Sequence, residues 1–204
     1  IAFVEESFGA WHVKGGLGNL TTTVHQRAVD VGVTFHLNSP VASIQTTGNK
    51  ATGVVLADGT IVNADAVIAN ADASLVYNKL ITGHKRALKK ARKNIANADV
   101  SVAGFSLLLG MRKDPEQVLN HHTILFPENY DAEFDAIFKE GKPVEKPTIY
   151  ICAPQDELMS KDENLEGWFV LVNAPTHGQF DWNNAEFSTR YANSIIDQIE
   201  ARGI

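Results

Sequence analysis

The sequence contains a single cysteine, Cys152, among 204 residues. One cysteine excludes an internal disulfide, and with it a disulfide-stabilised secreted scaffold or a metal site built from several thiolates. Positive charge is also scarce, with 18 Lys and Arg against 24 Asp and Glu and a net charge of -6. Because nucleic acids are bound through an excess of cations, this balance argues against nucleic acid as a partner.

Long hydrophobic runs and a hydrolase motif are missing as well. The longest apolar run, Val100–Met111, is bounded by charged residues and is too short to span a bilayer. No Gly-x-Ser-x-Gly nucleophile elbow occurs. The sequence opens on Ile1 without methionine and ends just past a predicted helix, so we expect a fragment of a longer protein.

The first third of the sequence predicts one helix and several short strands. Apolar residues recur at three- and four-residue steps from Leu17 to Val31, and Gly32 follows as a C-cap. Predicted strands are Val33–Leu37, Val41–Gln45, Thr52–Leu56, Thr60–Asn63 and Ala66–Ala69. Asp58-Gly59 would turn the hairpin, and the last run would be a strand buried on both faces.

After Asp72 the pattern changes to longer strands and separate helices. The β-prone runs are Val100–Met111, Thr148–Ala153 and Trp168–Ala174. Predicted helices are Asp131–Lys139, closed by Gly141, and one from Asn184 to Arg202-Gly203. This order predicts a mixed α+β fold with a largely antiparallel sheet and helices on one face. We place the main division at residues 72–74.

A glycine turn precedes the first helix and has two interpretations. Gly16-Leu17-Gly18-Asn19-Leu20-Thr21 approaches Gly-x-Gly-x-x-Gly, but Thr21 replaces the third glycine. The next predicted strand also ends in Asn38, without an acidic residue for a ribose. The favoured interpretation is a flexible turn that starts a helix. The alternative is a turn whose backbone approaches a cofactor held mainly elsewhere.

The reactive side chains predict neither a metal site nor a catalytic residue. His121 and His122 are adjacent, so their side chains are expected to point in different directions, and the other histidines lack zinc-site spacing. Cys152 lies in an alternating apolar strand, where a small buried hydrophobe is expected. The nearby carboxylates are expected to be solvated on one helix side; they are Asp131, Glu133, Asp135 and Glu140.

The segment Lys85–Lys93 carries six basic residues in nine positions. Such a helix can bind anionic lipid, at roughly 1 kcal/mol per cation. The favoured interpretation is a solvated helix face, and lipid contact gains weight only if the substrate is a lipid.

Several motifs together resemble bacterial-type phytoene desaturases, which are FAD-dependent carotenoid desaturases of the amine-oxidase-like flavoprotein superfamily. The early motifs are Trp11–Gly18, Leu37–Ile44, Ala57–Gly59 and Ala64–Asp72. The later, more discriminating motifs are His121–Phe126, Tyr130–Phe138, Tyr150–Pro154 and Val170–Pro175. They occur in the family's order over nearly the whole sequence.

The resemblance implies an enzyme that passes hydride from a long polyene precursor such as phytoene to FAD. It implies a partial FAD-binding domain over residues 1–73 and a substrate-binding domain over 74–204, whose strands form a sheet over an apolar cavity. The implied cofactor-binding residues are Gly15, Gly16, Val41, Asn70 and Ala71. A cytoplasmic location, with peripheral membrane contact, is the matching expectation.

Two departures from the family pattern limit these expectations. Trp11-His12-Val13 stands where the family commonly has Trp-Tyr-Pro, and the family's glycine-rich phosphate loop has no counterpart in this sequence. We therefore expect these residues alone to bind FAD weakly or not at all and to lack desaturase activity. The alternatives are an isomerase or saturase of another polyene or lipid on the same scaffold, and a non-catalytic lipid-binding module.

Overall fold

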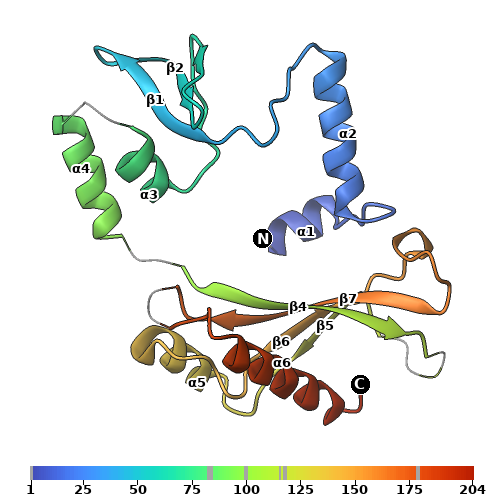
Figure 1. Ribbon diagram of the computed structural model, residues 1–204. Helices are drawn as coiled ribbons and strands as arrows, with labels where there is room; N and C mark the ends of the chain where they lie inside the picture. Colours follow the sequence, from blue (N-terminus) through green and yellow to red (C-terminus); the bar gives the residue numbers. More distant parts are fainter. Residues whose placement is uncertain (1, 82–84, 99–100, 115, 117–118, 178–179) are drawn as a thin grey trace. The chain divides into compact units, whose positions relative to one another are not determined.

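The computed structural model describes residues 2–81, 85–98, 101–114, 116, 119–177 and 180–204. The chain divides into two compact units, Ile1–Val31 with Val100–Ile204, and Gly32–Asp99 (Figure 1). The boundary predicted between residues 73 and 74 divides an FAD-binding part from a substrate-binding part. The division into compact units does not test what each part binds, so that boundary stays a prediction.

A four-stranded antiparallel sheet forms the centre of the first unit. Its strands are β4 (Ala103–Arg112), β7 (Leu165–Ala174), β6 (Ile149–Cys152) and β5 (His122–Leu125), in the order β4-β7-β6-β5. The long strands β4 and β7 pair from Ala103 opposite Ala174 to Arg112 opposite Leu165. The prediction that the three apolar runs form strands of one antiparallel sheet is confirmed; β5 was not predicted.

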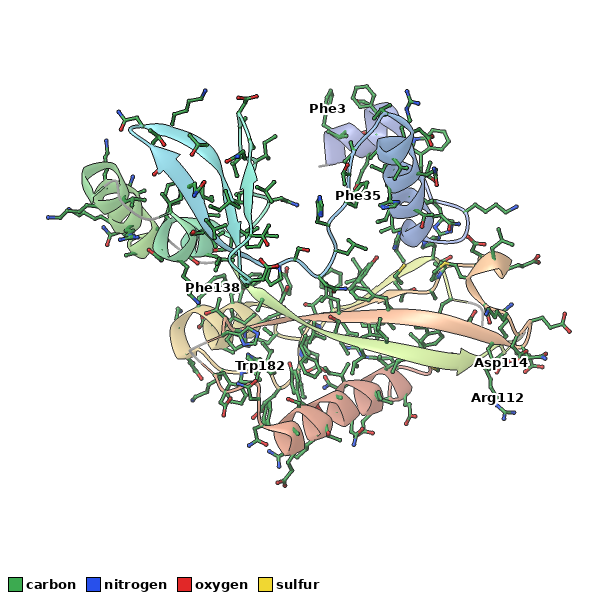
Figure 2. The ribbon with its side chains drawn as sticks, turned by 45° about the horizontal axis from the view of Figure 1, so that its top comes forward. Phe3, Phe35, Arg112, Asp114, Phe138 and Trp182 are labelled. Atoms are coloured by element: carbon green, nitrogen blue, oxygen red, sulfur yellow. The ribbon has the colours of Figure 1, made fainter. Side chains whose placement is uncertain are left out.

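Helix α6 (Ala185–Glu200) covers one face of this sheet. Its Tyr191, Ile195 and Ile199 pack against a strand surface that includes Ile151 and Val170. Burying each isoleucine or valine side chain of this core contributes about 1.5–3 kcal/mol to the stability of the fold. The side chain of Asn184 accepts a hydrogen bond from the Phe187 N–H at 3.0 Å, which confirms the predicted helix start. Figure 2 shows Trp182 on the α6 side of the sheet, near the N-terminal end of the helix.

The other helices of the first unit are short or exposed. They are α1 (Ala2–Phe8), α2 (Leu17–Asp30), α5 (Asp131–Phe134), the π-helical segment η2 (Asp135–Glu140) and the 3₁₀ turn η3 (Glu157–Met159). The predicted helix at 17–31 is confirmed, but no side chain of α2 is buried. Gly141 adopts the left-handed conformation predicted for the end of the 131–139 helix, with φ 64°.

The second unit combines a small sheet with short helices. Its antiparallel strands are β1 (Val41–Thr47), β2 (Lys50–Leu56) and β3 (Ile61–Asn63), and its helical segments are α3 (Ala73–Leu75), η1 (Val76–Leu80) and α4 (Lys85–Ala96). Among the residues of this unit that the structure describes, the large apolar side chains that are buried are Ile44, Val76 and Leu88. The predicted hairpin around Asp58-Gly59 and the predicted basic helix are both confirmed.

Two predicted strands of the second unit are wrong. Residues 33–37 and 66–69 lie outside both sheets, and Ile68, predicted to be buried, is 95% exposed. A short apolar run becomes a strand only where a neighbouring strand supplies ladder hydrogen bonds, and the sequence pattern cannot reveal whether that neighbour is present. Among the helices that the structure describes, none is long and apolar enough to span a bilayer.

Candidate functional site

The sheet face opposite α6 is the candidate site of the first unit. Strand alternation places apolar and polar side chains on it in rows that run across the strands. One row is Leu108, Phe169, Cys152 and His122, and the next is Ser106, Leu171, Tyr150 and Ile124. Leu108 is 82% exposed and Ile124 is 51% exposed. Apart from Ser106, the residues of these two rows are therefore apolar on β4 and β7, whereas β5 and β6 contribute titratable groups.

The titratable groups form one cluster of rings. The ring centroids of His121 and His122 are 4.4 Å apart, and those of His12 and His121 are 4.9 Å apart. The His122 Nδ1 lies 2.8 Å from the Tyr150 hydroxyl oxygen. The prediction that the two adjacent histidines diverge is wrong, because His121 lies in a bend just before β5, where strand alternation does not apply.

The prediction that Cys152 is a buried hydrophobic core residue is also wrong. It is only half-buried, because Ile149 and Ile151 take the core-facing positions of β6 and leave Tyr150 and Cys152 to the other face. Burial raises the pKa of the Tyr150 phenol, with further contributions from Cys152. Burial, together with the charges of His122 and His12, lowers the pKa of His121.

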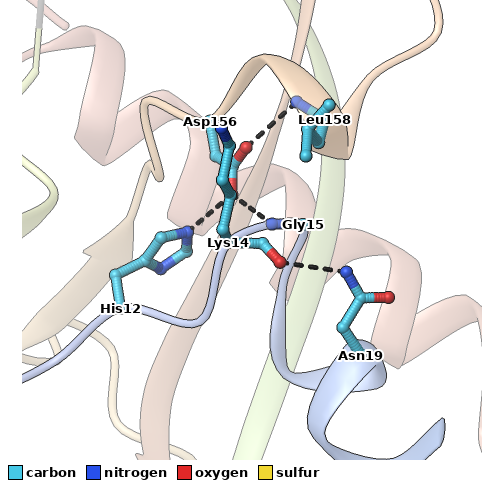
Figure 3. A network of polar contacts seen from close by, with 6 residues as sticks. All are labelled: His12, Lys14, Gly15, Asn19, Asp156 and Leu158. Atoms are coloured by element: carbon cyan, nitrogen blue, oxygen red, sulfur yellow. Dashed lines mark hydrogen bonds and ion pairs between the residues drawn. The ribbon is translucent and has the colours of Figure 1, made fainter. Parts of the chain in front are cut away.

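The glycine turn is fixed by a single carboxylate, Asp156 (Figure 3). One Asp156 oxygen accepts from the Gly15 N–H and lies 2.8 Å from the His12 Nε2, while the other accepts from the Leu158 N–H at 3.0 Å. These hydrogen bonds, with that of His12 first, lower the pKa of Asp156 from 3.8 to about 2. The turn is therefore anchored to the segment after β6, although the sequence favoured a flexible turn.

The turn also requires glycine for local steric reasons. Gly15 has φ 78°, and a Cβ there would lie 2.3 Å from the Asn19 Nδ2, which donates to the Lys14 carbonyl at 2.9 Å. Gly16 has φ 89°, and a Cβ there would lie 3.2 Å from the Met159 Cε. The backbone conformation and the neighbouring side chains of the protein therefore explain why both positions are glycine.

A cavity of about 400 Å³ lies beside this turn in the first unit. Its lining includes Asp114, Asp156, Glu157 and Glu166, with Lys113 as a counter-charge. Such a charged wall does not suit a hydrocarbon, so the exposed sheet face is the better candidate surface for an apolar ligand.

The predicted cofactor-binding residues lie in both units. Gly15 and Gly16 belong to the first unit. Val41 opens β1 opposite Leu56, and Asn70 and Ala71 are exposed residues in the second unit. They directly precede the carboxylate that caps α3. The role of these five positions in binding a cofactor stays a prediction.

A buried carboxylate was missed by sequence reasoning. Glu133 is 1% exposed and accepts from the Thr148 N–H at 2.7 Å and from the Asn173 amide at 2.8 Å. The expectation that Glu133 is solvated is wrong, whereas Asp131, Asp135 and Glu140 are exposed as predicted. The available signal was Asn173, a polar residue within the apolar run of β7 that needs a partner when buried.

Comparison with known proteins defines the class of this chain. Residues 2–133 match the family described as flavin containing amine oxidoreductase, and the chain belongs to that family. This confirms the resemblance stated from the motifs and the mixed α+β fold expected for it.

Its relatives include carotenoid desaturases. The chain is 33% identical to the zeta-carotene-forming phytoene desaturase of Myxococcus xanthus, over 98% of the chain and 39% of that protein. It is 34% identical to the lycopene-forming phytoene desaturase of a Paracoccus species, over 98% of the chain and 40% of that protein. It is 31% identical to the 4,4'-diapolycopene oxygenase of a Methylomonas species, over 76% of the chain and 30% of that protein. The chain thus spans less than half the length of these relatives.

Proposed function

We propose that the chain is part of an FAD-dependent desaturase of a carotenoid precursor such as phytoene, and that the exposed face of its four-stranded sheet binds the polyene. The exposure of Leu108, Ile124 and Phe169 on one face carries this proposal. A hydrocarbon has no group to hydrogen-bond, so its binding energy comes from apolar area such as this face offers.

The bound FAD would supply the redox chemistry by accepting hydride. The residues of this chain provide only part of a binding site for such a cofactor. Helix α2 begins at a turn without the third glycine, and its N-cap Gly16 has no side-chain hydrogen bond. The contribution that follows from the described residues is to bind the polyene, orient it and exclude water.

The polyene-binding face is tested in the full-length protein with Leu108→Ser. Leu108 is highly exposed, so its loss should not disturb folding. Losing one leucine contact of about 1.5 kcal/mol lowers kcat/KM for phytoene about tenfold. The matched control is Ile61→Ser, an exposed aliphatic residue on β3. Polyene absorbance reports turnover, and equal rates for both variants and the parent protein would count against the proposal.

The cofactor expectation is tested on the 204 residues alone. The purified chain is expected to carry little or no flavin, because the pyrophosphate lacks a glycine-rich loop over a helix N-terminus. Flavin absorbance in stoichiometric amount would contradict this.

A second candidate function is oxidation of a polyene end group. The similarity to 4,4'-diapolycopene oxygenase favours it. Pigment extraction from cells that express the full-length gene with phytoene, or with its C30 analogue, separates the candidates. Longer conjugation without added oxygen supports desaturation, whereas an oxygenated end group supports the second candidate. An isomerised or saturated product would indicate the same scaffold with other chemistry.

Contact with a membrane surface from the cytoplasmic side belongs to the same proposal, because the substrate is a lipid. Among the side chains of α4 that the structure describes, Lys89, Lys90 and Lys93 are exposed lysines, and each contributes roughly 1 kcal/mol near anionic lipid. Changing these three to Glu should abolish binding to phosphatidylserine vesicles but not alter the weak binding to phosphatidylcholine vesicles. The matched control changes the exposed lysines Lys50, Lys146 and Lys161 to Glu. Equal loss in both triple variants would contradict a role for α4.

A further inference from the structure

Three potential metal ligands meet on the exposed sheet face. His121, His122 and Cys152 each offer one ligand atom, and these atoms all lie within 4.8 Å of one another. The fold brings them together because His122 and Cys152 are directly opposite in the β5–β6 ladder. The His121 carbonyl, next to them, accepts a hydrogen bond from the Ala153 N–H at 3.0 Å, which holds the bend in place.

The separation of these atoms suits a tetrahedral cation. Zinc binds imidazole nitrogen at about 2.0–2.1 Å and thiolate at about 2.3 Å, which in a tetrahedral site places these neighbouring ligand atoms about 3.3–3.6 Å apart. A bound cation would draw the three ligand atoms closer together through side-chain rotation. Three protein ligands leave the fourth position to water on the exposed face.

The groups around the cluster favour metal binding. The His122 Nδ1 is occupied by the Tyr150 hydroxyl at 2.8 Å, which leaves its Nε2 for a cation, as outer partners of metal-binding histidines do. His12 contacts His121, but its Nε2 is engaged by Asp156, so it adjoins the site without joining the ligands.

We propose that His121, His122 and Cys152 form a site for a zinc-class divalent cation on the sheet face opposite α6. The combination of imidazole nitrogen with one thiolate selects Zn²⁺ over Mg²⁺ or Ca²⁺, which prefer oxygen ligands. This inference is independent of the proposed desaturase function and reverses the expectation, drawn from sequence spacing, that the chain has no metal site.

The test is titration of the purified 204-residue chain with Co²⁺ alone. Because Cys152 is the only cysteine, any thiolate-to-cobalt absorption must come from it. One equivalent of Co²⁺ should produce this band with the visible bands of a tetrahedral site, and Zn²⁺ should displace it. Mg²⁺ should leave the band unchanged.

The variants separate ligands from neighbours. Cys152→Ser should remove the band, and His121→Gln and His122→Gln should each weaken binding at least about 100-fold, whereas Tyr150→Phe should weaken it about tenfold through the outer shell. His12→Gln should change affinity by less than a factor of about three, since it keeps all three ligands. The exposed His36→Gln, in the second unit, is the matched control.

A second measurement covers variants that fold poorly. Zn²⁺ should slow alkylation of the Cys152 thiol in the parent chain, and EDTA should restore the rate. Absence of the charge-transfer band, or equal metal affinity in the parent chain and in Cys152→Ser, would overturn the proposal. So would loss of binding in His12→Gln equal to that in His122→Gln, or failure of Zn²⁺ to protect the thiol.

Discussion

Replacing Glu133 by alanine should destabilise the first unit by about 3 kcal/mol. The change leaves two partly buried donors without an acceptor, the Thr148 N–H and the Asn173 amide. Each unsatisfied donor costs about 1–3 kcal/mol, and relief from burying a carboxylate offsets part of the sum. Glu133→Gln keeps one acceptor and much of the volume, so its cost should be smaller, about 1–2 kcal/mol.

Urea unfolding followed by tryptophan fluorescence measures this loss. All three tryptophans, Trp11, Trp168 and Trp182, lie in the first unit, so the signal reports that unit. The matched control is Glu140→Ala, an exposed glutamate of the adjoining helical segment, expected to change stability by less than about 0.5 kcal/mol. If Glu133→Ala and Glu140→Ala unfold at the same urea concentration, the buried carboxylate does not hold these elements together.

Three further predictions concern the turn, the core and the small sheet. Because the folded pKa of Asp156 is lowered to about 2, the stability difference between the parent chain and Asp156→Asn should be constant above pH ~5 and vanish as the pH falls toward 2. A difference that instead shrinks between pH ~6 and ~8 would contradict this. Tyr191→Phe removes a buried hydrogen bond to the Val144 carbonyl and should cost about 1–2 kcal/mol in urea unfolding, whereas an unchanged midpoint would refute its role. Gly53→Ala places a Cβ 2.3 Å from the Val62 carbonyl oxygen, so amide exchange in β2 and β3 should accelerate while that of the first unit stays unchanged.

The sequence was sufficient to predict an element wherever the residue pattern of that element alone specifies it. The alternation of β4 and β7 and the four-residue steps of α6 each specify one buried face, so these elements followed from sequence. The helix caps at Asn184 and Gly141 followed from residue chemistry alone.

The remainder depends on partners that are distant in sequence. The runs 33–37 and 66–69 are apolar enough for strands, yet a strand forms only with a neighbour. Glu133 has the spacing of a solvated helix residue, and only the fold brings Thr148 and Asn173 to it. His121 escaped prediction because the bend before β5 removes the alternation on which the argument relied.

The polyene-binding proposal and the metal proposal can fail separately, because Leu108, whose variant tests the first, and His122 lie at opposite ends of one row of side chains. Leu108 and Phe169 lie on β4 and β7, while Cys152 and His122 lie on β6 and β5. With strands about 4.8 Å apart, the first and last residues of the row are about 14 Å apart, too far for direct contact. Leu108→Ser should therefore lower phytoene turnover in the full-length protein and leave cobalt binding to the chain unchanged. A cobalt affinity that falls with Leu108→Ser as it does with Cys152→Ser would mean that the variant disturbs the whole sheet, and the turnover result would then no longer locate the polyene.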